Sequence, residues 1–165
     1  MPSPQAAVKC YISMSRVFLS IIVTACAATA QKYDGPKPPK PDLPYIKHAD
    51  TLLSTEAVEA KTQKKKDDTL YTIDGANSPA KTPLAAPILL FQSGKINPEN
   101  LQLFRLESKN GQREFSLQKS GEPIRIEVTK LGDTLSRIEP SNGLDPGEYA
   151  LLASGSNQLF CFAVF

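Results

Sequence analysis

The chain has 165 residues, of which 41% are apolar, and it contains 14 prolines, three cysteines, one histidine and no tryptophan. Basic residues number 19 and acidic residues 17, and the net charge of +2 excludes a strongly basic nucleic-acid-binding protein and a chain dominated by an acidic tail. This length suits one modest globular domain with flanking segments, and the few histidines and cysteines leave little for metal or nucleophile chemistry.

The first 30 residues are typical of a secretory signal peptide. Lys9 and Arg16 precede an uncharged, mostly apolar run over residues 17–28, and Ala28-Thr29-Ala30 provides the small residues of a signal peptidase site. A helix of this run would rise only about 18 Å, short of the roughly 30 Å hydrocarbon core, so a permanent transmembrane span is not expected. We therefore predict cleavage after Ala30 and a secreted, periplasmic or other cell-envelope location.

Two alternatives stay open at this end of the chain. Val23-Thr24-Ala25-Cys26 is similar to a bacterial lipobox, in which the cysteine is acylated and becomes the new N-terminus. Lipidation at Cys26 would anchor the protein to a membrane, whereas cleavage after Ala30 would release it. Met14 would also make a conventional signal start, which leaves open whether residues 1–13 are translated.

A proline-rich segment follows the predicted signal. Five prolines and three lysines lie between Gln31 and Tyr45. Each proline fixes φ, removes a backbone donor and biases the preceding residue towards extended geometry, so we expect polyproline II instead of a helix or a central strand. We predict a linker over residues 31–50 that is a plain spacer, a ligand for a proline-binding groove, or a strap docked on the domain through Tyr33, Leu43 and Tyr45.

The segment after this linker is predicted to begin the folded domain. Residues 51–66 fit a helical stripe only loosely, and we favour a hairpin from about 54–61 to 68–74 over a short helix. The β-branched and aromatic residues of Thr69–Ile73, followed by the turn dipeptide Asp74-Gly75, indicate a strand.

Strands and loops alternate through the middle of the chain. Three prolines make residues 77–87 a predicted loop, and Ile88–Phe91 is a predicted apolar strand. Asn97-Pro98-Glu99 has the residues that cap a single helical turn. The strongest local pattern predicts a hairpin over residues 103–117, because its Asn110-Gly111 dipeptide suits the positive φ angles of a type I′ turn.

The C-terminal third continues this pattern. Ile124, Ile126 and Val128 alternate with polar residues, which predicts a strand packed on one side and solvated on the other. Residues 159–165 are apolar on both faces and are expected inside a sheet, where Cys161 would be a buried, inert thiol. Seven to nine short strands at roughly ten-residue spacing predict an all-β domain over the rest of the chain from residue 51, an antiparallel β-sandwich.

One motif refines this prediction. Leu144-Asp145-Pro146-Gly147-Glu148-Tyr149 is similar to the Leu-x-Pro-Gly-x-Tyr segment that enters the penultimate strand of many immunoglobulin-like domains. Fibronectin type III-like modules of exported bacterial proteins use the same turn. The resemblance implies an immunoglobulin-like sandwich but no activity. It also implies a corner in which the tyrosine hydroxyl bonds to nearby backbone and locks the crossover between the sheets. The corner residues would be Leu144, Pro146, Gly147 and Tyr149.

The usual catalytic motifs are absent from the sequence. It has no Gly-x-Ser-x-Gly, its only histidine, His48, lies in the predicted linker, and Ser93-Gly94-Lys95 lacks the upstream glycine of a phosphate-binding loop. Four glutamates are candidates for the paired carboxylates of a glycosidase, but a solvated outer face explains their strand and turn positions more simply. These are Glu107, Glu114, Glu122 and Glu127. We expect no catalytic, cofactor-binding or metal-binding residues.

We therefore expect a non-catalytic, monomeric module that binds an envelope protein or another envelope component, or that supports envelope structure. A small exported hydrolase or carbohydrate-active domain is the first alternative, and two facing carboxylates with raised pKa values in a concave pocket would favour it. The second alternative is a folding or secretion partner that adds a strand to another protein.

Overall fold

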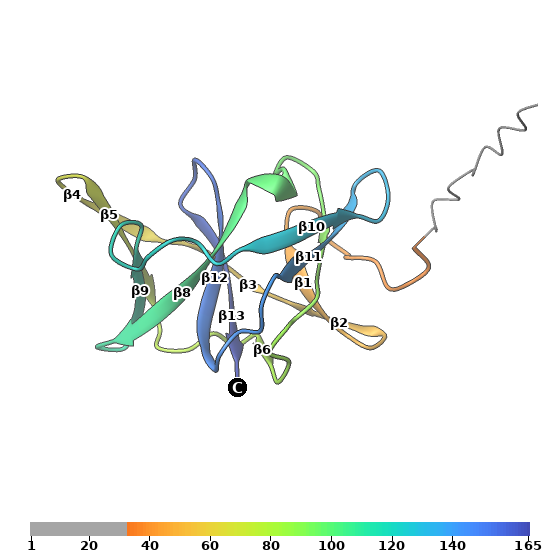
Figure 1. Ribbon diagram of the computed structural model, residues 1–165, viewed down its shortest axis with the longest axis horizontal. Helices are drawn as coiled ribbons and strands as arrows, with labels where there is room; N and C mark the ends of the chain where they lie inside the picture. The colour runs from red at the N-terminus through yellow and green to blue at the C-terminus, as the bar shows by residue number, and fades with distance from the viewer. Residues whose placement is uncertain (1–32) are drawn as a thin grey trace, which may run out of the picture. The chain divides into compact units, whose positions relative to one another are not determined.

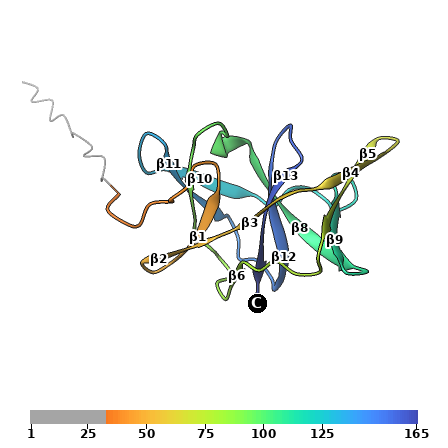
Figure 2. The same ribbon diagram turned by 180° about the vertical axis from the view of Figure 1, so that it is seen from behind.

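A computed structural model describes residues 33–165 of the chain. The predicted signal peptide, the Ala30 cleavage site and the Cys26 lipidation site lie outside the described residues. The described part is almost entirely antiparallel β structure in two packed sheets (Figure 1, Figure 2). The prediction of an all-β antiparallel sandwich is therefore confirmed.

The smaller sheet has five strands in the order β10-β11-β7-β1-β2. The strands are β1 (Pro44–His48), β2 (Thr51–Ser54), β7 (Leu89–Gln92), β10 (Ile126–Lys130) and β11 (Leu135–Pro140). Tyr45 and Ile46 of β1 are buried, and they pair with Leu90 and Leu89 of β7. The first strand of the described chain is thus an inner strand of this sheet.

The larger sheet has eight strands, seven of them in the order β3-β13-β12-β8-β9-β5-β4, with β6 beside β13. The β6–β13 pair is parallel, and the other pairs of this sheet are antiparallel. The strands are β3 (Glu56–Glu59), β4 (Lys61–Lys65), β5 (Asp68–Asp74), β6 (Lys81–Thr82), β8 (Leu101–Lys109), β9 (Gln112–Ser116), β12 (Gly147–Ala153) and β13 (Gln158–Val164).

The larger sheet coils, because β3 and β4 stand at opposite ends of its strand order although only Ala60 separates them in the chain. β3 pairs with β13 and β4 pairs with β5, so one stretch of chain joins the two ends of the sheet (Figure 2). Ala60 is buried, and its N–H donates to the carbonyl oxygen of Asn157 at 2.9 Å. The coil encloses an apolar interior on one face of the sheet.

Two apolar cores lie on opposite faces of β12 and β13. The first lies between the two sheets, where Leu151 of β12 belongs to the same buried cluster as Ile138 of β11. The second lies inside the coil, where the ring of Phe115 stacks against those of Tyr71 and Phe104 with centroid separations of 4.8 Å. Both cores therefore depend on the last two strands of the chain.

The last strand is buried on both faces from Leu159 to Val164, which confirms the prediction of an interior strand, whereas Phe165 is exposed. Cys161 is a free, buried cysteine inside the coil. Burial raises the pKa of the Cys161 thiol to about 12, so the thiol stays protonated at neutral pH. This agrees with the prediction of an inert thiol.

The linker predicted over residues 31–50 ends earlier than expected. Residues 44–48 form β1, and residues 49 and 50 make the turn into β2. Pro44 fits a strand because it is the first residue, where the missing N–H disturbs the ladder least. The segment from Tyr33 to Leu43, which we call the strap, contains the buried Pro38, and Leu43 packs against the core between the sheets.

Residues 51–66 form strands and not a short helix. The partner of β5 is β4, so the hairpin begins later than the predicted 54–61, because residues 56–59 pair with the distant β13 instead. Residues 33–165 contain thirteen strands, more than the seven to nine predicted. The additional strands are short and carry no apolar alternation that would mark them in the sequence, as in β2 and β6.

Local predictions for the middle of the chain are confirmed. Asn110 and Gly111 have φ angles of 53° and 76°, and they connect Lys109 to its strand partner Gln112. At the 3₁₀ helix η1 (Pro98–Asn100), the Asn97 side chain accepts a hydrogen bond from the N–H of Glu99 at 3.1 Å. Turn and cap residues act over a few positions, so they are readable without the tertiary fold.

Candidate functional site

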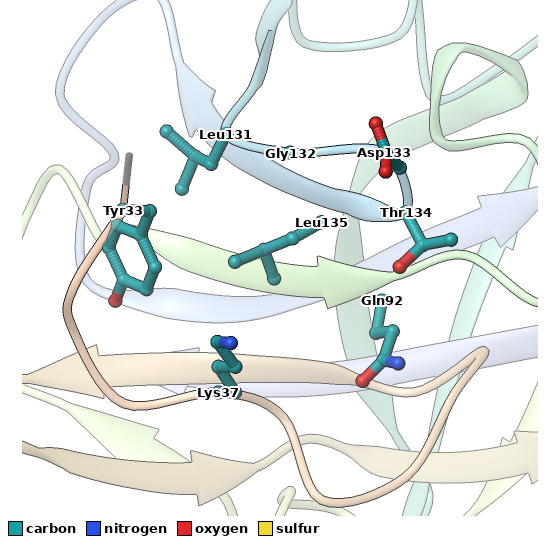
Figure 3. A pocket seen from close by; sticks show the side chains of 8 residues that line it. All are labelled: Tyr33, Lys37, Gln92, Leu131, Gly132, Asp133, Thr134 and Leu135. Carbon is teal, nitrogen blue, oxygen red and sulfur yellow. The ribbon is translucent and has the colours of Figure 1, made fainter. Parts of the chain in front are cut away.

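A cavity of about 340 Å³ lies beside the strap and one end of the smaller sheet, and we call it the strap pocket (Figure 3). Tyr33 and Lys37 of the strap form one wall, and Gln92 at the end of β7 and residues 131–135 form the rest. This volume falls within the roughly 300–1,000 Å³ of small-molecule sites. The pocket brings together three segments that are far apart in the sequence.

The walls of the strap pocket combine apolar and polar groups. Figure 3 shows the Tyr33 ring and the Leu131 and Leu135 side chains near one another, with Lys37 and Gln92 below them in the view. The Tyr33 hydroxyl donates to the carbonyl oxygen of Pro36 at 3.2 Å, and burial raises the pKa of this phenol. A ligand with an apolar face and several hydrogen-bonding groups would match these walls.

Backbone hydrogen bonds hold the turn between β10 and β11 that contributes most of the pocket. The N–H groups of Leu131 and Gly132 both donate to the carbonyl oxygen of Leu135, at 2.8 and 3.2 Å. Ser93 donates its N–H to the carbonyl oxygen of Thr134 at 2.7 Å. This wall is therefore fixed to the end of β7 without help from side chains.

Asp42 fastens the strap to the same end of β7. Its carboxylate accepts hydrogen bonds from the N–H groups of Gly94 at 2.8 Å, Lys95 at 2.8 and 2.9 Å, and Ile96 at 3.0 Å. Its own N–H donates to the carbonyl oxygen of Gln92 at 2.8 Å. Burial alone would raise the pKa of Asp42, but the three amides and the charge of Lys95 lower it overall.

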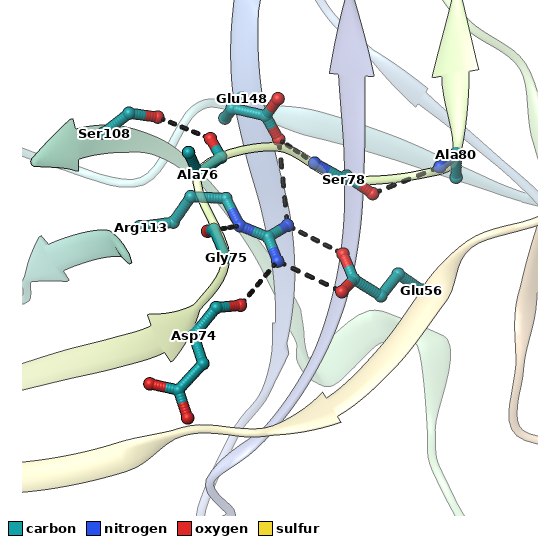
Figure 4. Close-up of polar contacts among 9 residues, drawn as sticks. All are labelled: Glu56, Asp74, Gly75, Ala76, Ser78, Ala80, Ser108, Arg113 and Glu148. Atoms are coloured by element: carbon teal, nitrogen blue, oxygen red, sulfur yellow. Dashed lines mark hydrogen bonds and ion pairs between the residues drawn. The ribbon is translucent and has the colours of Figure 1, made fainter. Parts of the chain in front are cut away.

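A second polar feature lies within the coil of the larger sheet (Figure 4). Arg113 of β9 is completely buried, and its guanidinium donates to both carboxylate oxygens of Glu56 of β3, at 2.7 and 3.1 Å. It also donates to the carbonyl oxygens of Gly75 at 2.9 Å and Asp74 at 3.4 Å. Glu148 of β12 approaches to 3.7 Å, so this ion cluster joins four strands of the larger sheet, β3, β5, β9 and β12, and the loop that begins at Gly75.

Burial and neighbouring charges shift the pKa values of this cluster in opposite directions. Burial alone would lower the pKa of Arg113, but the hydrogen bond and charge of Glu56, with the other acidic groups nearby, raise it overall. Burial raises the pKa of Glu148, although the amide of Ser78 and the charge of Arg113 act in the opposite direction. The Ser78 N–H donates to Glu148 Oε2 at 2.9 Å. The arrangement ties strands together, as buried ion pairs with satisfied donors do.

Of the four carboxylates predicted as glycosidase candidates, only Glu107 and Glu114 come together. Glu107 and Glu114 face each other across the β8–β9 hairpin and line a cavity of about 430 Å³. Lys109 Nζ lies 2.5 Å from Glu107 and 3.2 Å from Glu114, and its hydrogen bond and charge lower the pKa of Glu107. A general acid needs the opposite shift. Glu127 lies on β10 of the smaller sheet, and Glu122 is exposed in the loop before it.

Glu148 is a carboxyl group with a raised pKa that lines a cavity, of about 350 Å³, together with Lys81 and Arg105. A second carboxylate that could work with Glu148 is that of Glu56, on the other side of Arg113. Both Glu56 oxygens accept hydrogen bonds from the Arg113 guanidinium. Both Glu56 oxygens therefore serve the ion pair with Arg113. Sequence reasoning missed this cluster, although Arg113 shares its strand face with the apolar Phe115, which is an unusual place for arginine.

The predicted tyrosine corner residues lie together where the chain passes from β11 in the smaller sheet to β12 in the larger. The Tyr149 hydroxyl donates to the carbonyl oxygen of Asp145 at 2.7 Å, which is the form of hydrogen bond the sequence suggested. Leu144 is buried in the core between the sheets. Arg105 donates to the carbonyl oxygen of Pro146 at 3.1 Å, and its guanidinium lies 6.0 Å from the Tyr149 ring centroid. The immunoglobulin-like relationship itself stays a prediction.

No family model, curated protein or solved structure matches the chain. Within residues 33–165, no three His, Cys, Asp or Glu side chains are grouped so that they could hold a metal ion. In the same range, no helix has the length and apolar character needed to cross a membrane. The cavities and polar clusters of residues 33–165 are thus the guide to what the protein does.

Proposed function

We propose that the protein is an exported, non-catalytic β-sandwich module that binds a cell-envelope component in the strap pocket. The observation that carries this proposal is the pocket itself, in which Tyr33, Leu131 and Leu135 provide apolar surface beside the polar groups of Lys37 and Gln92. Short cell-wall saccharides and peptides have both an apolar face and many hydrogen-bonding groups, and such a ligand would use both kinds of wall.

Calorimetric titration with a soluble muropeptide, a cell-wall disaccharide with its stem peptide, tests this proposal. Tyr33→Ala removes the aromatic wall and should weaken binding about tenfold or more, as truncation of a central aromatic contact does. Lys37 and Lys40 are both exposed strap lysines, but only Lys37 lines the pocket. Lys37→Ala should weaken binding, whereas the matched Lys40→Ala should not. Equal effects of the two lysine variants would contradict the proposal, as would no binding at all.

Export is proposed from the sequence of residues 1–30. Cell fractionation and the intact mass of the protein test it together. A mature mass that begins at Gln31 supports release after Ala30, and a lipid adduct that disappears in Cys26→Ser supports the anchored alternative. A full-length protein in the cytoplasmic fraction would contradict both routes.

Among the carboxylates described above only Glu148 combines a raised pKa with a cavity, whereas the hydrolase alternative needs two such groups facing each other. The pKa of Glu107 is lowered by Lys109, and Glu56 is held by Arg113. We therefore propose a binding role and no reaction for this chain.

A further inference from the structure

The loop that follows β7 presents three successive backbone N–H groups to one point in space. The N–H groups of Gly94, Lys95 and Ile96 all donate to Asp42, with distances from 2.8 to 3.0 Å. Successive amides that converge in this way form a concave nest for anions, like the nests that hold phosphate or carboxylate groups elsewhere. The occupant is the carboxylate of Asp42, which lies 52 residues before Gly94 in the chain.

We propose that the amides of Gly94, Lys95 and Ile96 form an oxyanion-binding site, which Asp42 fills as an internal ligand and thereby holds the strap in place. The site takes a carboxylate or a phosphate group, since both present oxygens to convergent N–H groups. This goes beyond the proposed function, because it concerns the strap and holds for any ligand of the strap pocket.

The loop is shaped for this close approach. A Cβ atom on Gly94 would lie 2.7 Å from Asp42 Oδ2 and 3.3 Å from Pro41 Cβ, so a side chain at this position would push the carboxylate out of the nest. Lys95 adds a positive charge beside the carboxylate, which favours an anion there. Residue 94 is therefore glycine because the Asp42 carboxylate lies so close, and not because of the turn alone.

Asp42 also adopts a conformation that its contacts must stabilise. Its φ angle of 57° lies in the left-handed region, which non-glycine residues seldom adopt and which aspartate and asparagine tolerate best. In this conformation the Asp42 N–H reaches the carbonyl oxygen of Gln92 while the carboxylate reaches the nest. Main chain and side chain together attach the strap to the end of β7.

The contact between Asp42 and the nest supports the wall of the strap pocket that the strap forms. Tyr33 and Lys37 precede Asp42 in the same strap, and Gln92 both lines the pocket and accepts the Asp42 N–H. An oxyanion that competes for the nest would release Asp42 and loosen this wall. The strap would thus be docked by a replaceable contact, in contrast to β1, which is part of the sheet.

Hydrogen exchange of the Gly94, Lys95 and Ile96 amides in the mature protein tests the inference. Asp42→Ala should speed exchange of all three about tenfold or more, because each loses a charge-assisted hydrogen bond. Formate or phosphate should slow it again, compared with chloride at equal ionic strength, and the more effective of the two identifies the preferred anion. The matched control Asp34→Ala alters an exposed strap acid and should leave these amides unchanged.

Unchanged exchange in Asp42→Ala, or equal rescue by chloride, would overturn the inference. Asp42→Asn, which keeps an acceptor oxygen without the charge, replaces Asp42→Ala if that variant does not fold. Its three amides should exchange faster than those of the wild type, but by less than the factor expected for Asp42→Ala. Gly94→Ala should reproduce the effect of Asp42→Ala, and the two changes should not add in the double variant. Additive effects would mean that the two residues act at separate sites. None of these measurements uses a pocket ligand, so their outcome is independent of the proposed function.

Discussion

A buried guanidinium such as that of Arg113 is costly unless its charge and its donors are matched. Glu56 supplies two hydrogen bonds, and carbonyl oxygens of the Asp74–Gly75 turn supply more. Glu56→Ala should lower the free energy of unfolding by about 3 kcal/mol, the lower end for breaking a buried ion pair, because Glu148 remains nearby. Urea unfolding measures this.

The control for that experiment is an exposed ion pair in the same sheet. Lys61 and Asp74 are 2.8 Å apart, with both side chains largely in solvent. Lys61→Ala should leave stability nearly unchanged, since exposed pairs contribute little. If Glu56→Ala were no more harmful than Lys61→Ala, the Arg113 cluster would not be holding the coil together.

Glu148 should make stability depend on pH. Burial raises its pKa in the folded protein above the ordinary value of 4.5, so folding favours the protonated acid. The stability that the protonated Glu148 contributes to the free energy of unfolding is therefore fully present below the pKa of Glu148 in the unfolded chain. It is lost as pH rises through the pKa of Glu148 in the folded protein. The stability of the wild type relative to Glu148→Gln should fall as pH rises above about 4.5. A difference that does not vary with pH would contradict the raised pKa.

The hydroxyl of Tyr149 offers a test of the tyrosine corner. It donates to the Asp145 carbonyl oxygen at 2.7 Å where the chain crosses between the sheets. Tyr149→Phe should lower stability by about 1 kcal/mol, because the ring still fills the core while the carbonyl loses its partner. Thermal unfolding measures this, and an unchanged melting curve would show that the hydrogen bond does not stabilise the corner.

Among the elements, the β8–β9 hairpin depends on backbone conformation at its turn. Gly111 has a φ of +76° and no neighbouring atom within 4 Å of the position a Cβ would take. Gly111→Ala should therefore cost about 1 kcal/mol through backbone strain alone. Gly132 also has open space but no positive φ, and Gly132→Ala should be neutral or slightly stabilising. Equal effects in urea unfolding would contradict this explanation.

Elements with local signals were predictable from the sequence, and elements made by distant pairing were not. The Asn110-Gly111 hairpin and the Asn97 cap depend on neighbouring residues. β1 was hidden because prolines dominate its surroundings, and its place is decided by pairing with β7, more than 40 residues away. β3 is polar and short, and only its pairing with the distant β13 defines it as a strand.

The candidate sites were less predictable than the fold, for the same reason. Arg113 meets Glu56 across 57 residues, and Asp42 meets the loop after β7 across more than 50. The strap pocket takes its walls from three separate segments, and none carries a motif. Ser93-Gly94-Lys95 lacks the glycine spacing of a phosphate-binding loop, yet the backbone N–H groups of Gly94 and Lys95 donate to the Asp42 carboxylate.

For the molecule as a whole, β12 and β13 are the strands that both cores share. One face of each packs against the smaller sheet, and the other faces the interior of the coil. The strap pocket lies away from these strands, on the turn between β10 and β11 and the end of β7. The fold thus leaves the proposed binding site outside the two strands that both cores share.

The most direct test of the proposed function is a map of which backbone amides respond to the muropeptide across the whole protein. In NMR spectra of the labelled mature chain, we predict shifts at Gln92 and residues 131–135, with the β8–β9 hairpin unaffected. Shifts centred on Glu107 and Glu114, or no shifts at Gln92 and residues 131–135, would contradict the strap pocket as the binding site.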